Sequence, residues 1–138
     1  MLNIVSYIAS YYILMKNFLI FILFIILSFS SSNAKVNKSD KEKLIKCLGL
    51  YAAHSFLTQD KLSLENIEHS LGGKKFLTMY LIENGMNEDE VNKKMIEITD
   101  EIYGQPFDEK GSKNCDLYVY NLIPGSKEKI DELGSNQY

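Results

Sequence analysis

The first helical pattern of the chain begins at Ser39. Ser39 and Glu42, three residues later, form a capping box, in which the two side chains bond to backbone N–H groups at the start of a helix. Apolar residues then recur at offsets of three and four, the spacing of one helix face. This pattern predicts a helix from Ser39 to about Leu57. Its apolar positions are Leu44, Cys47, Leu48 and Tyr51.

A second helical pattern extends from Leu64 to Glu83. Gly72 and Gly73 stand near its middle, and glycine weakens a helix interior because it loses the most backbone freedom on folding. We therefore expect a break or kink at this pair. Asn84-Gly85 then predicts the end of the helix, because glycine readily takes the left-handed conformation that closes a last turn.

The third pattern is the clearest of the chain. Asn87 and Glu90 form a second capping box, and acidic residues occupy the first turn, where the helix dipole favours them. We expect the helix to end at Tyr103-Gly104, because Pro106 disfavours helical geometry at the residue before it. Its apolar positions are Val91, Met95, Ile98 and Ile102.

The last part of the chain predicts a loop and two shorter helices. The polar stretch Gln105 to Lys113 is expected to be a loop, followed by a helix from Asn114 to about Ile123 that Pro124-Gly125 ends. Ser126 to Leu133 is expected to form one or two amphipathic turns. No segment after residue 34 predicts a strand convincingly. The fold class expected is therefore all-α, a small bundle of four to five helices.

The first 34 residues differ from the rest, since Lys16 is their one charged residue. Lys16 precedes about a dozen apolar residues, and Ser32 and Ala34 supply small side chains at the minus-three and minus-one positions of a cleavage site. The pattern predicts a signal peptide over residues 1–34, cleaved before Lys35. Residues 35–138 would then be the mature helical domain, exported to the periplasm.

Residues 1–14 are not part of the signal pattern. Because Met15 alone opens a well-formed signal, we expect translation to begin there. The alternative is a transmembrane anchor that includes Ile4 to Leu14. Lys16 and Asn17 interrupt that stretch, and the uninterrupted apolar run is shorter than the roughly 20 residues that a span needs. After cleavage we expect no membrane association.

Composition excludes two classes of function. Residues 35–138 contain 14 lysines, no arginine and 18 acidic residues, a net charge of −4. Because the lysines are interspersed among acids, the body lacks the basic patch that nucleic-acid binding needs. A body of this length holds one modest core, which excludes a multidomain enzyme.

The two cysteines of the chain, Cys47 and Cys115, both fall in the predicted mature domain. An even number of cysteines in an exported chain predicts a disulfide, because the oxidising compartment does not keep thiols reduced. Such a bond would link the first predicted helix to the fourth. The alternative, a reactive thiol, is disfavoured because neither cysteine has a CxxC partner or a neighbouring histidine.

Candidate catalytic residues are few. His54 lies among apolar residues of the first predicted helix, where a partly buried structural role is expected. His69 follows Glu65 by four residues and adjoins Glu68, a spacing suited to an ion pair or weak metal binding. There is no HExxH, Cys/His cluster, GxSxG or phosphate-binding loop. We therefore expect no enzymatic activity, no cofactor and no metal.

The predicted loop offers the candidate binding residues. An apolar tip among charges is suited to insertion into another protein's cleft, and the alternative is an ordinary connector. The candidate residues are Pro106, Phe107, Asp108, Glu109 and Lys110.

The arrangement of the two cysteines resembles a known family. Cys47 lies in the first helix within Leu44 to Leu48, and Cys115 lies late in the chain within Asn114 to Tyr118. The segment Ile98 to Tyr103, a polar loop and then Cys115 complete the likeness. An exported helical domain of about 100 residues with this organisation resembles the periplasmic immunity proteins of type VI secretion amidase effectors.

The resemblance implies a function and a partner. Proteins of that family protect the producing cell by binding a peptidoglycan amidase toxin and occluding its active-site groove, and they often act as homodimers. The candidate loop would then deny substrate access to the cognate amidase effector. The alternative left open is a small exported helical binding or adaptor protein of the cell envelope, such as a lysozyme-type inhibitor or a chaperone-like module.

Overall fold

A computed structural model of the chain describes residues 36–135, and the helix is the only kind of regular secondary structure in this part of the chain. The predicted all-α fold class is confirmed. The expected signal peptide, its cleavage site and the expected start at Met15 lie outside the described residues. Between residues 36 and 135 the helices are α2 (Lys38–Ser55), α3 (Leu64–Glu83), α4 (Glu88–Ile102), α5 (Glu109–Leu122) and α6 (Ser126–Ser135).

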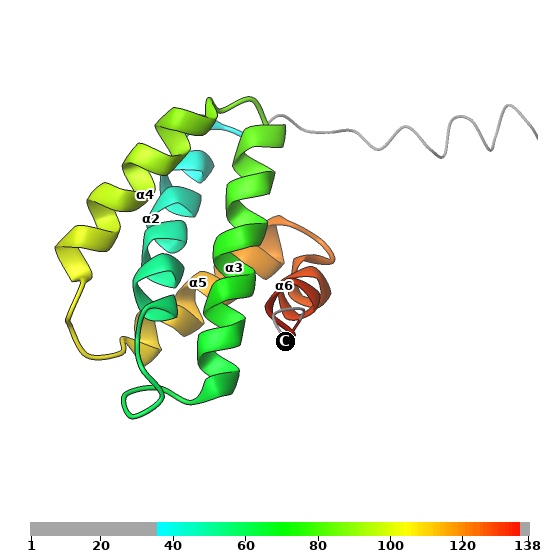
Figure 1. Ribbon diagram of the computed structural model, residues 1–138. Coiled ribbons are helices and arrows are strands. Elements are labelled where there is room, and N and C mark those ends of the chain that lie inside the picture. Colours follow the sequence, from blue (N-terminus) through cyan, green and yellow to red (C-terminus); the bar gives the residue numbers. More distant parts are fainter. Residues whose placement is uncertain (1–35, 136–138) are drawn as a thin grey trace, which may run out of the picture. The chain divides into compact units, whose positions relative to one another are not determined.

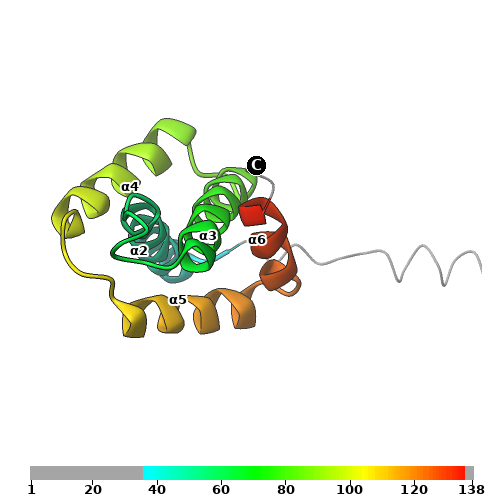
Figure 2. The same cartoon turned by 60° about the horizontal axis from the view of Figure 1, so that its bottom comes forward.

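Helices α2 and α3 lie side by side at the centre of the bundle, and α4, α5 and α6 surround them (Figures 1 and 2). Helix α2 contacts α3, α4 and α5, and α3 also packs closely against α6. Because several neighbours cover α2, nine of its eighteen residues are buried. The first helix of the domain is thus its central one.

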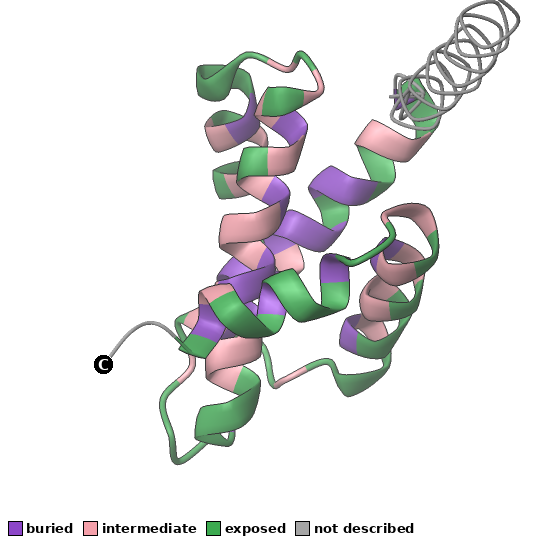
Figure 3. Ribbon diagram, turned by 90° about the vertical axis from the view of Figure 1, so that its right-hand side faces the viewer, coloured by how far each residue is buried: buried purple, intermediate pink, exposed green. Residues whose placement is uncertain are grey.

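The core consists of aliphatic and aromatic side chains that all five described helices contribute. They lie on the faces that the helices turn toward one another, while the outward faces are exposed (Figure 3). Burial of such side chains is the main favourable contribution to folding. The fully buried members are Leu44, Leu48, Tyr51, Leu77, Leu81, Val91, Val119 and Ile130.

Asparagine side chains cap two of the helices. Asn37, and not the predicted Ser39, caps α2, and its Oδ1 accepts from the backbone N–H of Asp40 at 2.9 Å. The prediction was wrong by two residues because either side chain can cap a helix, and Asn37 starts it earlier. Asn87 caps α4 as predicted, and its Oδ1 accepts from the N–H groups of Asp89 and Glu90.

The glycine pair does not interrupt α3, which is continuous from Leu64 to Glu83. The prediction of a break at Gly72 and Gly73 was wrong because tertiary packing outweighs the weak local preference. A Cβ at Gly72 would overlap the carbonyl oxygen of Ile130 in α6, and one at Gly73 would lie 2.7 Å from the ring of Tyr51. The missing side chains therefore allow α6 and α2 to approach α3 closely.

The predicted loop Gln105 to Lys113 is only half a loop, because α5 begins at Glu109. Asp108 caps this helix by accepting from the N–H of Gly111 at 2.9 Å, and Lys113 pairs with Glu109 at 2.7 Å one turn on. These local contacts start the helix five residues before the predicted Asn114. At the other end of the domain, α6 continues to Ser135, beyond the predicted Leu133.

The predicted disulfide joins Cys47 of α2 to Cys115 of α5, across a sequence separation of 68 residues. Both cysteines are bonded, which excludes the alternative of a reactive thiol. The bond is compatible with an exported protein. None of the helices between residues 36 and 135 combines the length and the apolar character that a membrane crossing requires.

Candidate functional site

A cavity of about 390 Å³ lies where the end of α2 meets the α2–α3 loop and the α4–α5 connection, residues 103–108. We call it the end cavity. Its walls are largely apolar, with a few polar groups at the edge, which is the usual character of a binding site. Its lining includes Leu50, Ala53, His54, Phe56, Leu57, Lys61, Ile102, Tyr103, Pro106 and Asp108.

Two aromatic side chains project from the rim of the end cavity. Phe56 is 58% exposed and Tyr103 is 67% exposed, and their rings meet edge to face with centroids 6.4 Å apart. The ammonium of Lys74 lies 5.4 Å from the centroid of the Phe56 ring. Large aromatic side chains exposed beside a cavity are typical of the residues that contribute most to protein–protein binding.

His54 forms the inner wall of the end cavity and contacts the α4–α5 connection. Its Nε2 accepts from the backbone N–H of Asp108 at 3.3 Å, and its ring lies 4.6 Å from that of Phe107. Burial lowers the pKa of His54, and the charge of Asp108 opposes this only in part. The ring is therefore neutral near pH 7. The prediction of a structural role for His54 on α2 is consistent with these contacts.

The structure separates the predicted binding residues into three groups. Pro106 and Asp108 line the end cavity. Phe107 points inward onto His54 and is not an exposed tip. Glu109 and Lys110 are exposed in the first turn of α5 and belong to no loop.

Sequence reasoning missed the two rim aromatics. Phe56 was expected inside the first helix, and it follows the last residue of α2. Tyr103 was expected to end the third helix, and it does so at the edge of the connection. Their signal in the sequence is an aromatic residue at each of two helix ends, but only the fold shows that these ends adjoin.

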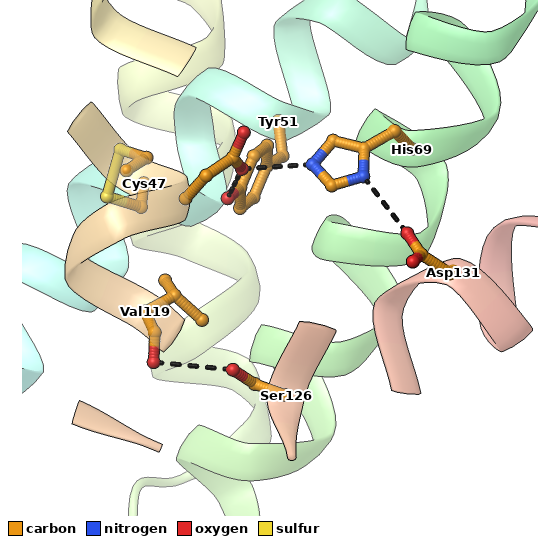
Figure 4. Close-up of polar contacts among 8 residues, drawn as sticks. Cys47, Tyr51, His69, Val119, Ser126 and Asp131 are labelled. Carbon is orange, nitrogen blue, oxygen red and sulfur yellow. Dashed lines mark hydrogen bonds and ion pairs between the residues drawn. A yellow bond between two sulfur atoms is a disulfide. The ribbon is translucent and has the colours of Figure 1, made fainter. Parts of the chain in front are cut away.

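A second polar cluster joins α3 to α2, α5 and α6, and we call it the His69 junction (Figure 4). Asp116 Oδ1 accepts from the Tyr51 hydroxyl at 2.5 Å and lies 2.9 Å from His69 Nε2. His69 Nδ1 lies 3.6 Å from Asp131 Oδ1. The partner carboxylates come from α5 and α6 and not from Glu65, whose spacing in the sequence is also suited to an ion pair.

The electrostatics of the His69 junction favour a charged imidazole. The hydrogen bond to Asp116 raises the pKa of His69, burial opposes it, and the charges of Asp116 and Asp131 add to the increase. Burial raises the pKa of the Tyr51 phenol, and the bond to Asp116 adds to it. Both ring nitrogens of His69 face carboxylates. The junction is thus arranged to hold helices together.

No group of three or more His, Cys, Asp or Glu side chains within residues 36–135 is arranged to hold a metal ion. The chain was also compared with known proteins. No protein-family model, no curated protein and no solved structure matches it.

Proposed function

We propose that the protein is a periplasmic immunity protein that binds a peptidoglycan amidase toxin and occludes its active site, thereby protecting the producing cell. The observation that carries the proposal is the exposed pair Phe56 and Tyr103 on the rim of the end cavity. Exposure of two adjacent large aromatic rings is costly in water and is relieved by a partner. The disulfide supports export, and the family resemblance supplies the class of toxin.

In this proposal inhibition is steric. Phe56 and Tyr103 enter the toxin's groove, and Pro106, which is exposed on the same connection as Tyr103, also lines the end cavity. The exposed carboxylates Asp108 and Glu109 meet basic groups near the groove and guide the encounter. Because helices α4 and α5 hold both ends of the connection, little conformational entropy is lost when the toxin binds.

A second candidate function is an envelope adaptor with more than one binding surface. It is favoured by Ile96 on α4 and Leu117 on α5, which are exposed apolar residues that do not line the end cavity. An adaptor would use them for a second partner. They are also candidates for a homodimer contact, which sedimentation of the purified protein would detect.

Capture of partners tests the site. The chain would be produced with a C-terminal tag, purified from the periplasm and used as bait for envelope and secretion-effector proteins. Once an amidase is captured, we expect Phe56→Ala and Tyr103→Ala each to weaken its binding by about 30-fold, the effect of losing a hot-spot side chain. Leu117→Ala removes an equally exposed apolar side chain elsewhere and should bind like the wild type.

A protection assay tests the activity. Periplasmic production of the amidase should lyse cells, and co-production of the wild-type chain should prevent cleavage of their peptidoglycan. The Tyr103→Ala variant should protect less than Leu117→Ala does. Capture of other envelope proteins without any amidase, or equal protection by both variants, would contradict the proposal and favour the adaptor.

A further inference from the structure

His54 attaches the α4–α5 connection to the end of α2. The backbone N–H of Asp108 donates to its Nε2 at 3.3 Å, and the Phe107 ring meets the imidazole at an interplanar angle of 61°. His54 is only 4% exposed. Both contacts come from adjacent residues at the point where the connection joins α5. One side chain therefore fixes the position of this end of the connection.

The hydrogen bond requires a neutral ring. Nε2 accepts from Asp108 only when it carries no proton, so the proton of the neutral ring lies on Nδ1. Nδ1 is buried and has no hydrogen-bond partner among residues 36–135. Protonation would set an N–H at Nε2 against the N–H of Asp108. It would also leave a buried cation without an acceptor at Nδ1.

The charged surroundings of His54 favour this protonation only weakly. Asp108 is the neighbouring carboxylate that favours the charged ring. Lys61 from the α2–α3 loop and Tyr103 from the connection also line the end cavity, and α4 contributes the apolar Ile102. Burial outweighs Asp108 and lowers the pKa of His54 from its ordinary value of 6.5.

We propose that His54 is an acid-sensitive latch on the α4–α5 connection. With a neutral ring, the connection is docked and residues 103–108 form one wall of the end cavity. With a protonated ring, the Asp108 N–H and the Phe107 ring leave the imidazole, and this wall opens. The latch is closed at neutral pH and opens on acidification. It is a property of the fold and holds whichever partner the cavity binds.

Amide hydrogen exchange measured by NMR tests the latch. The full chain, purified from the periplasm with its disulfide intact, would be followed from about pH 7.5 to about pH 5, with the imidazole signals reporting the titration of His54. After correction for the intrinsic pH dependence of exchange, protection of the Asp108 amide should fall by about tenfold as His54 titrates. The amide of Leu77, in the core of α3, should keep its protection.

Two variants separate the latch from general acid sensitivity. His54→Gln retains an acceptor near the position of Nε2 and removes the titration, so the Asp108 amide should stay protected throughout. His69→Gln removes the other histidine of the chain, and the fall in protection of the Asp108 amide on acidification should remain in this variant. The proposal would be overturned if protection of the Asp108 amide did not change while His54 titrates. It would also be overturned if the fall in protection persisted in His54→Gln.

Discussion

His54 and His69 have surroundings that favour opposite charge states. His54 is buried and accepts from a backbone N–H, which favours the neutral ring. His69 lies between Asp116 and Asp131, which favour the cation. No local pattern predicts this difference, because the carboxylates that decide it lie 47 or more residues from His69 in the sequence. A local sequence pattern shows only the near neighbours of His69, such as Glu65.

Substitution of His69 by Gln should lower stability most at acidic pH. The raised pKa means that the folded chain binds the proton more tightly than the unfolded chain does. The contribution of the charged ring is therefore fully present below about pH 6.5 and is lost as pH rises through the folded-state pKa. Below that pH we expect the free energy of unfolding of the wild type, measured with urea, to exceed that of His69→Gln by on the order of 1 kcal/mol.

Glu65→Gln provides the control for this measurement. Glu65 lies one helical turn before His69, but the carboxylates that approach the His69 imidazole are those of Asp116 and Asp131. This variant should keep the pH dependence of the wild type. A stability difference between wild type and His69→Gln that grows as pH rises would contradict the assignment of the charged pair.

At the scale of helices, apolar spacing and caps predicted most of the elements but not all of their ends. The cap at Asn87 and the end of α4 before Gly104 are set by local contacts, and both were predicted. The start of α5 was missed because the cap Asp108 was interpreted as part of a charged loop. The continuity of α3 at Gly72 was missed because it depends on α6, which a local pattern does not contain.

Gly72→Ala should destabilise the protein by separating α3 from α6. The added Cβ would overlap the backbone at Ile130, and backbone atoms cannot move aside as a flexible side chain can. We expect a loss of about 1 to 3 kcal/mol in the free energy of unfolding, measured by urea denaturation. Alanine is otherwise the better helix former, so a local effect alone would give the opposite sign.

Met79→Ala is the matched control on the same helix. Met79 is exposed, and its truncation should change stability by no more than about 0.5 kcal/mol. If Gly72→Ala were as stable as wild type while Met79→Ala behaved as expected, the close contact between α3 and α6 would not limit the packing of the bundle.

For the whole molecule, the even number of cysteines in a chain expected to be exported predicted the disulfide, and the helical spacing of the apolar residues predicted the all-α class. The candidate site was predicted only in part. Pro106 and Asp108 do line the end cavity, but Phe107 faces inward, and the exposed rings are Phe56 and Tyr103. These two rings become neighbours only when the ends of α2 and α4 meet, and that arrangement follows from tertiary packing.

Reduction of the Cys47–Cys115 bond should lower the free energy of unfolding by about 4 kcal/mol. The bond closes a long loop, with a sequence separation of 68 residues, and so restricts the unfolded chain strongly. Urea unfolding with and without a reducing agent measures the difference. The double variant Cys47→Ser, Cys115→Ser should have the stability of the reduced protein and no response to the reductant. Equal midpoints with and without reductant would contradict the prediction.

The central position of α2 also bears on the order in which the chain folds during its synthesis. Of the described helices, α2 is synthesised first, yet its neighbours α3, α4 and α5 all follow it, and Cys47 finds its partner only in α5. A nascent chain that ends within α4 lacks the cover that α5 gives to α2 and retains an unpaired thiol at Cys47. We therefore expect the domain to reach its final structure as a unit only when α5 and α6 are both present, because α6 packs against α3 and contributes the buried Ile130.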